Sequence, residues 1–65
     1  MCGSLGRNLR RARLDREMTQ EEVAERSGVH ATEVSRIESG KRDPQVSTVQ
    51  RLAEAVGLTA SDLLR

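Results

Sequence analysis

The apolar residues of this chain recur with the period of an amphipathic α-helix, and no stretch alternates as a β-strand does. Near the N-terminus, Leu5, Leu9 and Ala12 follow the spacing i, i+4, i+7, which predicts a first helix over about residues 5–16. The other faces of this helix are rich in arginine. The pattern therefore indicates an all-α fold that begins with a helix carrying one apolar stripe.

Thr19 and Glu22 mark the start of a second helix. A threonine followed three residues later by a glutamate forms a capping box, in which the hydroxyl accepts one free backbone N–H and the carboxylate accepts another. The second helix is therefore expected to begin at Gln20. Gly28 should end it after about two turns, because glycine takes the left-handed conformation without a Cβ penalty.

A third helix is expected over about residues 31–39. Its inward side chains would be Val34 and Ile37, and Gly40 would end it. Residues 41–44 are predicted to be a loop, because Pro44 disfavours helical geometry at Asp43 and the third helix cannot continue through it.

Two further helices complete the expected fold. The fourth would begin near Val46 or Ser47 and end at Gly57. Its apolar face is predicted to hold Val49, Leu52, Ala53 and Val56. Thr59 with Asp62 resembles another N-terminal cap and would open a short fifth helix.

The composition limits what the domain can hold. The 65 residues contain no aromatic residue, one cysteine and one histidine. An internal disulfide needs a cysteine pair and a structural zinc site takes about four ligands, so we expect no disulfide, metal or other cofactor. Aromatic stacking on unpaired bases, the usual device of single-strand binders, is excluded. No catalytic triad can be built around the single histidine and no glycine-rich phosphate loop is present, so the sequence does not indicate an enzyme.

The chain also shows no sign of a membrane segment. Its apolar runs are far shorter than the ~20 residues that span a bilayer, and its first residues lack an apolar signal segment. We therefore expect one cytoplasmic domain over residues 1–65, with residues 1–4 disordered and Cys2 a free thiol.

The formal net charge of +1 hides an uneven distribution. Residues 1–17 hold five arginines against two carboxylates, whereas residues 18–38 hold two arginines against five glutamates. Residues 39–51 are basic again, with three basic residues against one aspartate. One interpretation is ordinary solvated helix faces. The other is a basic rim around an acidic body, which would attract nucleic acid.

The second and third predicted helices, joined by a tight glycine turn, have the proportions of a helix-turn-helix. In that arrangement one helix crosses the DNA backbone while its partner lies in the major groove. Ala24 is small where the two helices must approach closely, and Gly28 permits the sharp turn. Three apolar residues would hold the crossing angle, namely Val29, Val34 and Ile37. An interpretation from another class is a helical adaptor that uses the same fold to bind protein without DNA contact.

The segments 19–24, 27–29 and 34–42, together with Pro44, resemble the Cro/C1-type helix-turn-helix family, which has the phage repressor-like fold. The resemblance covers about residues 5–64. It implies a five-helix cytoplasmic protein of bacterial or phage type that binds double-stranded operator DNA, usually as a homodimer on a palindromic site. The implied role is transcription regulation, as a repressor.

The resemblance also implies a set of DNA-contacting residues. The outward residues of the third helix would face base edges, namely Ala31, Thr32, Ser35 and Arg36. Residues at the start of the second helix and after the third would bind backbone phosphates, namely Gln20, Ser39, Lys41 and Arg42. The chemistry agrees independently, because helix N-termini and basic side chains attract phosphate while polar side chains on a groove-facing helix read bases.

Four positions depart from the family pattern or have two interpretations. Glu17 stands where a glycine commonly closes the first helix, which predicts modest strain or a different exit. Ala31 stands where many relatives have a long polar base reader, so specificity is expected to shift to the other outward residues. Glu33 is interpreted as a base contact or, preferably, as a carboxylate that phosphates repel. For His30, at the expected N-cap of the third helix, a phosphate contact and a turn residue without function are both open.

Two packing contacts are also expected. Arg13 and Glu22 should form an ion pair that joins the first and second helices, with Glu38 as the alternative partner of Arg13. On DNA, a two-fold dimer would place its recognition helices about 34 Å apart. The candidate dimer seam is the apolar C-terminal stretch that holds Leu58, Leu63 and Leu64.

Overall fold

The structure is a computed structural model that describes residues 2–65, with side chains from Leu5 onward. Met1 and the side chains of residues 2–4 lie outside what the structure describes. The expectations of disorder in residues 1–4 and of a free thiol at Cys2 concern these parts of the chain. All regular elements of the described chain are α-helices: α1 (Cys2–Asp15), α2 (Gln20–Ser27), α3 (Ala31–Glu38), α4 (Val46–Ala55) and α5 (Ala60–Leu63). The predicted all-α, five-helix fold is confirmed, although α1 begins earlier than expected.

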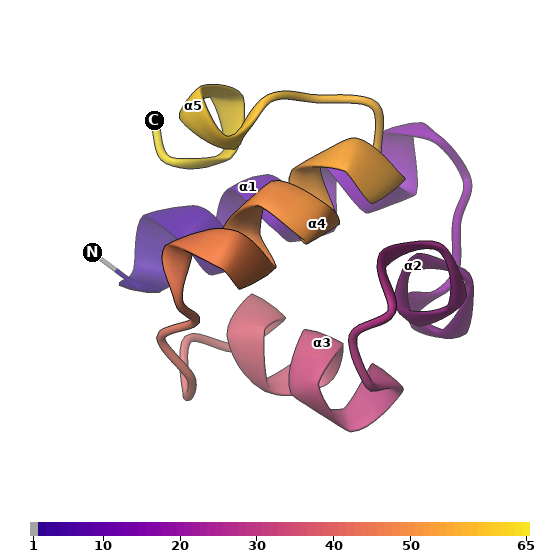
Figure 1. The fold of residues 1–65 in the computed structure, drawn as a ribbon, viewed down its shortest axis with the longest axis horizontal. Coiled ribbons are helices and arrows are strands. Elements are labelled where there is room, and N and C mark those ends of the chain that lie inside the picture. The colour runs from indigo at the N-terminus through magenta and orange to yellow at the C-terminus, as the bar shows by residue number, and fades with distance from the viewer. Residues whose placement is uncertain (1) are drawn as a thin grey trace.

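The helices surround one apolar core (Figure 1). α3 lies along one side of the domain and α5 along the opposite side, with α1 and α4 between them. The fully buried large side chains come from all five helices and the segment after α4, namely Leu9, Val23, Val34, Ile37, Leu52, Val56 and Leu63. No helix in the described part of the chain is long and apolar enough to cross a membrane.

Both predicted capping boxes are present. Thr19 Oγ1 accepts a hydrogen bond from the Glu22 backbone N–H at 3.0 Å, and the Glu22 carboxylate accepts from the Thr19 N–H at 2.8 Å. Thr59 and Asp62 repeat the arrangement at α5, with distances of 3.2 and 3.1 Å. The starts of α2 and α5 are therefore set by side chains within the first turn of each helix.

Glu17 stands at the end of α1 with a left-handed backbone, φ 55°. The Met18 N–H then donates to the Arg13 carbonyl at 3.0 Å, which closes the helix. The same closure ends α3 and α4, where the left-handed residues are Gly40 and Gly57. A left-handed conformation costs a residue with a Cβ about 1 kcal/mol, so of the two expectations for Glu17 the backbone angle favours strain.

α1 packs against the end of α3 with almost no space between the two backbones. A Cβ atom on Gly6 would overlap the Ile37 carbonyl oxygen and lie 2.8 Å from the Glu38 carbonyl oxygen. Only glycine permits this approach. The contact brings the N-terminal half of α1 beside the C-terminal end of α3.

Candidate nucleic-acid interface

The turn between α2 and α3 is fixed by hydrogen bonds at its buried side. The Gly28 N–H donates to the Ala24 carbonyl at 2.9 Å, and Gly28 is left-handed, with φ 74°. The buried Ser27 hydroxyl donates to the Ala24 carbonyl at 3.4 Å and accepts from the Val29 N–H at 3.1 Å. Sequence reasoning gave Ser27 no role of its own. Its short side chain adds a second link across the turn that joins the two helices.

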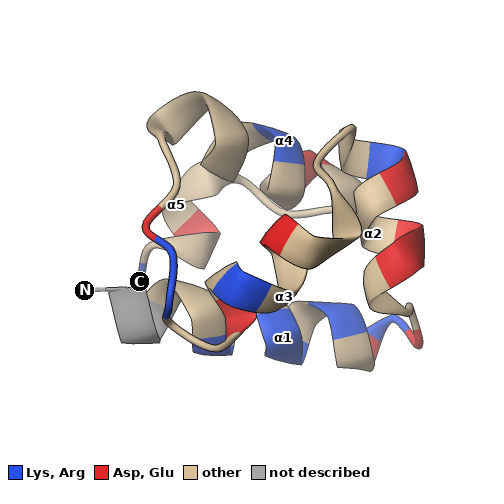
Figure 2. Ribbon diagram, turned by 90° about the horizontal axis from the view of Figure 1, so that it is seen from below, with Lys and Arg blue, Asp and Glu red and all other residues tan. Residues whose placement is uncertain are grey.

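α3 has one buried face and one exposed polar face. Val34 and Ile37 are fully buried, as expected. The opposite side of α3 is open to solvent and is seen from the front in Figure 2, where no other helix covers it. The predicted base-contacting residues lie on it, with Thr32, Ser35 and Arg36 exposed and Ala31 half-buried. The structure thus brings these four side chains to one accessible surface.

His30 caps the N-terminus of α3. Its Nδ1 atom accepts a hydrogen bond from the Thr32 backbone N–H at 3.2 Å. A neutral imidazole that accepts through Nδ1 carries its proton on Nε2, so the exposed ring has one donor left for another group. His30 therefore has a structural role, and its Nε2–H stays accessible.

Arg13 and Glu38 form a bidentate ion pair that joins α1 to α3. The Arg13 Nε and Nη2 atoms lie 2.7 and 3.0 Å from the two carboxylate oxygens of Glu38. The two side chains are only 12% and 5% exposed. Hydrogen bonding to Glu38 raises the pKa of Arg13 above its ordinary value.

Two more hydrogen bonds extend this cluster. Arg13 Nη1 donates to the Met18 carbonyl at 2.9 Å, and Gln20 Nε2 donates to Glu38 Oε1 at 3.1 Å. The cluster therefore connects α1, α2 and α3. The expected pair between Arg13 and Glu22 is wrong, and the alternative partner, Glu38, is correct. Glu22 is exposed and its carboxylate is already held by the capping box.

The loop after α3 is tied back to that helix. Arg42 Nε lies 2.8 Å from Glu33 Oε2, and the two side chains are 56% and 27% exposed. Ser39 Oγ donates to the Arg36 carbonyl at 3.0 Å, while Lys41 is exposed. The ion pair compensates the negative charge of Glu33 on the helix expected to approach DNA.

Arg7 and Arg10 were not singled out from the sequence, yet they border the same surface. One cleft beside the end of α3 is lined by Arg7, Arg10, Glu38, Ser39 and Gly40. A neighbouring cleft is lined by Arg10, Arg13, Gln20, Ser35, Glu38 and Ser39. Figure 2 shows basic residues of α1 along the edge of α3. Gly6 was the available signal, because a glycine has no Cβ and so allows another backbone to come close to the helix.

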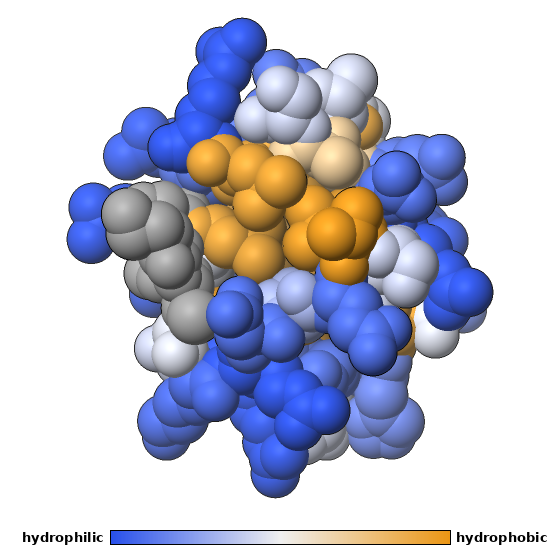
Figure 3. All heavy atoms as spheres, turned by 60° about the vertical axis from the view of Figure 1, so that its left-hand side comes forward, coloured by the Kyte–Doolittle hydropathy of each residue, from blue (hydrophilic) through white to orange (hydrophobic). Residues whose placement is uncertain are grey.

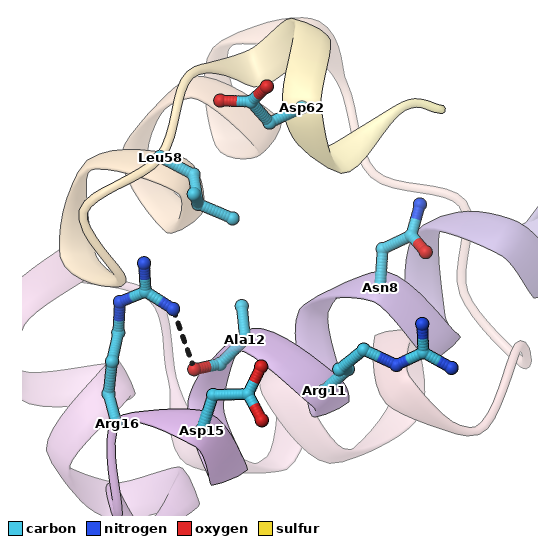
Figure 4. Close-up of a pocket in the computed structure, with 7 residues that line it drawn as sticks. All are labelled: Asn8, Arg11, Ala12, Asp15, Arg16, Leu58 and Asp62. Carbon is cyan, nitrogen blue, oxygen red and sulfur yellow. Dashed lines mark hydrogen bonds between the residues drawn. The ribbon is translucent and has the colours of Figure 1, made fainter.

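A groove between α1 and the segment around α5 has a different character (Figure 4). It is lined by Asn8, Arg11, Ala12, Asp15, Arg16, Leu58 and Asp62, so its two arginines are balanced by two aspartates. Arg16 Nη1 donates to the Ala12 carbonyl at 3.2 Å. No group of three or more His, Cys, Asp or Glu in the described part of the chain is placed to hold a metal.

The expected dimer seam is only partly exposed. Leu63 is wrong as a seam residue, because its side chain is fully buried in the core. Leu58 is half-buried and packs against the core, whereas Leu64 is 57% exposed. Val46, at the start of α4, is 67% exposed. Figure 3 shows apolar surface gathered on the side of the domain that carries both chain ends and the start of α4.

Comparison with known proteins places this fold among transcription regulators. Over 60 residues, the chain is 40% identical to the HTH-type transcriptional regulator y4dJ of Sinorhizobium fredii, covering 92% of this chain and 78% of the relative. It is 42% identical over 62 residues to the HTH-type transcriptional repressor RghR of Bacillus subtilis, covering 94% of this chain but 46% of RghR.

Solved structures agree with this placement. The crystal structure of the restriction-modification controller protein C.AhdI from Aeromonas hydrophila matches with a TM-score of 0.92 at 27% identity, over 95% of this chain and 94% of that one. The hypothetical transcription factor NHTF from Neisseria matches with a TM-score of 0.93 at 31% identity, over 98% of this chain and 74% of that one. The family model for helix-turn-helix domains matches residues 9–63. The chain is therefore a member of the Cro/C1-type helix-turn-helix family.

Proposed function

We propose that this domain binds double-stranded DNA in a sequence-specific manner, inserts α3 into the major groove and represses transcription. The observation that carries the proposal is the exposed polar face of α3, with Thr32, Ser35 and Arg36 on a helix anchored through Val34 and Ile37. A rigid helix that projects polar side chains from a small domain suits the width of the major groove. Relatives named as transcription regulators support the same role.

Base contacts in this proposal come from α3. Arg36 would bind a guanine through a pair of hydrogen bonds to O6 and N7, which is the commonest specific contact of arginine. Thr32 and Ser35 would bind neighbouring base edges. Ala31, which has no polar group, would contact a thymine methyl.

Phosphate contacts come from the two ends of the helix pair. Gln20 uses one amide N–H to bind Glu38, which leaves its other N–H for a phosphate beside the start of α2. His30 would donate through Nε2, on the opposite side of the ring from its cap hydrogen bond. Lys41 and Arg42 would bind the backbone beyond the end of α3, where both are exposed, and Ser39 would join them by turning its hydroxyl from the Arg36 carbonyl to a phosphate.

We further propose that two copies bind a palindromic operator. One recognition helix reads only part of a turn, and a two-fold dimer would place the second helix about 34 Å away in the next major groove. Val46 begins α4 and Leu64 precedes the last residue, and both are exposed large apolar residues. The start of α4 and the C-terminal end lie on the same side of the domain in Figure 1, so these two side chains would form the seam. Because this seam offers only these two exposed large apolar side chains, we expect dimers to form mainly on DNA.

Selection of bound duplexes from a random pool tests the proposal directly. The expected result is an enriched palindrome whose half-sites are centred about 10 base pairs apart. Arg36→Ala should then lose about 1–3 kcal/mol of binding free energy on the selected site and much less on a scrambled one. Lys41→Ala should weaken both equally and lower the salt dependence. A pool without enrichment at any salt concentration would contradict the proposal and favour a protein-binding adaptor.

A further inference from the structure

We infer that α1 carries an additional phosphate-binding site, formed by Arg7 and Arg10, that receives a DNA backbone phosphate beside the C-terminal end of α3. The inference rests on the proposed DNA binding and extends it to a helix outside the helix-turn-helix. It adds two contacts to those at the start of α2 and in the loop after α3.

The position of α1 follows from Gly6. Its backbone lies against the Ile37 and Glu38 carbonyls, so the first turns of α1 run directly beside the end of α3. Arg7 and Arg10 are spaced i, i+3 and therefore lie on one face of α1. Both are exposed, and both line the cleft that contains Ser39 and Gly40.

The electrostatics of this surface favour an anion. Glu38 is the only carboxylate that lines the two clefts beside α3. Its charge is compensated by Arg13 at 2.7 Å, and its Oε1 atom also accepts a hydrogen bond from the neutral Gln20 amide at 3.1 Å. Among the described residues, Arg7 and Arg10 belong to no ion pair. Their two guanidinium groups thus leave the surface with an excess of positive charge.

The location identifies the anion as a backbone phosphate. Arg10 shares its second cleft with Ser35, which lies on the exposed face of α3 proposed to enter the groove. A helix seated in the major groove has phosphates along both groove walls, and these would lie beside α1 as well as beside the loop after α3. Exposed arginines bind a free anion only weakly, because water competes for both partners. When α3 is docked in the groove, the phosphate is already held beside these arginines, so no further orientational entropy of the DNA is lost when they bind it.

Arg11 provides a matched control. It is also an exposed arginine of α1, and it shares a pocket with Arg7, Arg10 and Asp15 on that helix, but it lines neither of the clefts beside α3. Arg11→Ala changes the net charge and the intrinsic helix propensity of α1 by the same amounts as Arg10→Ala. The two variants therefore differ in the position of the lost charge.

The test measures the affinity of the full 65-residue chain for its selected duplex over a series of salt concentrations, for wild type, Arg7→Ala, Arg10→Ala, Arg10→Lys and Arg11→Ala. Far-UV circular dichroism checks that each variant is folded. Loss of one phosphate contact should reduce the slope of log K against log salt by about 0.9, which is roughly fivefold in affinity at ~0.15 M salt. We expect this loss for Arg7→Ala and Arg10→Ala, on selected and scrambled duplexes alike, with the slope kept in Arg10→Lys and Arg11→Ala.

Ethylation of single phosphates gives a second readout. At one phosphate, ethylation should weaken wild-type binding more than it weakens the binding of Arg10→Ala, because only Arg7 is left to contact that phosphate in the variant. Equal slope changes in Arg10→Ala and Arg11→Ala, or an unchanged slope in the Arg7 and Arg10 variants, would overturn the inference while the proposed function stands. Absence of wild-type binding to any duplex would overturn both.

Discussion

Glu38 is the acidic partner in the contact that joins α1, α2 and α3, and Glu38→Ala removes it while leaving the Arg13 guanidinium in place. That guanidinium would keep only the Met18 carbonyl as a hydrogen-bond acceptor in this cluster, at 2.9 Å. Breaking a buried ion pair by removing one partner costs about 3–5 kcal/mol, because the remaining charge is uncompensated. With 12% of the Arg13 side chain exposed, water relieves part of this cost, and we expect about 3 kcal/mol.

A loss of this size is large for a domain of 65 residues. Native domains have unfolding free energies of roughly 0.05–0.15 kcal/mol per residue, which corresponds to about 3–10 kcal/mol for this chain. In a domain of this size each kcal/mol shifts Tm by about 4–8 °C, so Glu38→Ala should lower Tm by about 12–24 °C. Because the chain has no aromatic residue, the melt is followed by far-UV circular dichroism.

Glu22→Ala is the matched control, since Glu22 was the partner expected from the sequence. It would lose one exposed capping hydrogen bond and should cost about 1 kcal/mol. The double variant Arg13→Met/Glu38→Leu should recover most of the loss, because it removes both buried charges together. A Glu22→Ala variant destabilised as much as Glu38→Ala would refute the assignment.

Three further variants test other parts of the structure. Glu17→Gly should raise the unfolding free energy by about 1 kcal/mol by relieving the left-handed strain, and an unchanged or lower Tm would contradict this. Hydrogen bonds from Thr59 lower the pKa of Asp62 below its ordinary value of 3.8 in the folded state, so the ionised carboxylate stabilises the fold above pH 3.8 and this stabilisation is lost as the pH falls through the folded pKa. In Asp62→Asn, Tm should therefore fall less on acidification than in wild type. An identical dependence of Tm on acid pH in the two proteins would argue against this. Arg42→Ala should cost less DNA affinity in a Glu33→Gln background than in wild type, because no carboxylate is left uncompensated; equal costs by fluorescence anisotropy would exclude this coupling.

The local features of the fold could be predicted from the sequence because their causes lie within a few residues. Thr19 with Glu22 sets the start of α2 by contacts inside one turn, and Gly28 sets its end by its own backbone conformation. The buried face of α3 followed from the helical period through Val34 and Ile37. These signals are independent of how the helices pack.

The contacts between helices needed the structure. Arg13 had two acidic candidates, and which one lies beside it depends on how closely α1 approaches the end of α3. Gly6 allows that approach, and its partners are carbonyls distant in the sequence. The same approach brings Arg7 and Arg10 beside α3. Leu63 was misplaced because α5 has only four residues, too few to show which side faces the core.

Atom-level changes to the DNA test the central claim, the entry of α3 into the major groove, most directly. Replacing guanine by 7-deazaguanine removes the N7 acceptor from the major groove, while inosine removes the N2 amino group from the minor groove. We predict that one 7-deazaguanine in each half-site of the selected duplex weakens wild-type binding by about 1–3 kcal/mol and leaves Arg36→Ala unaffected, and that inosine changes neither. Wild-type binding that tolerates 7-deazaguanine at every position but is weakened by inosine would contradict the account.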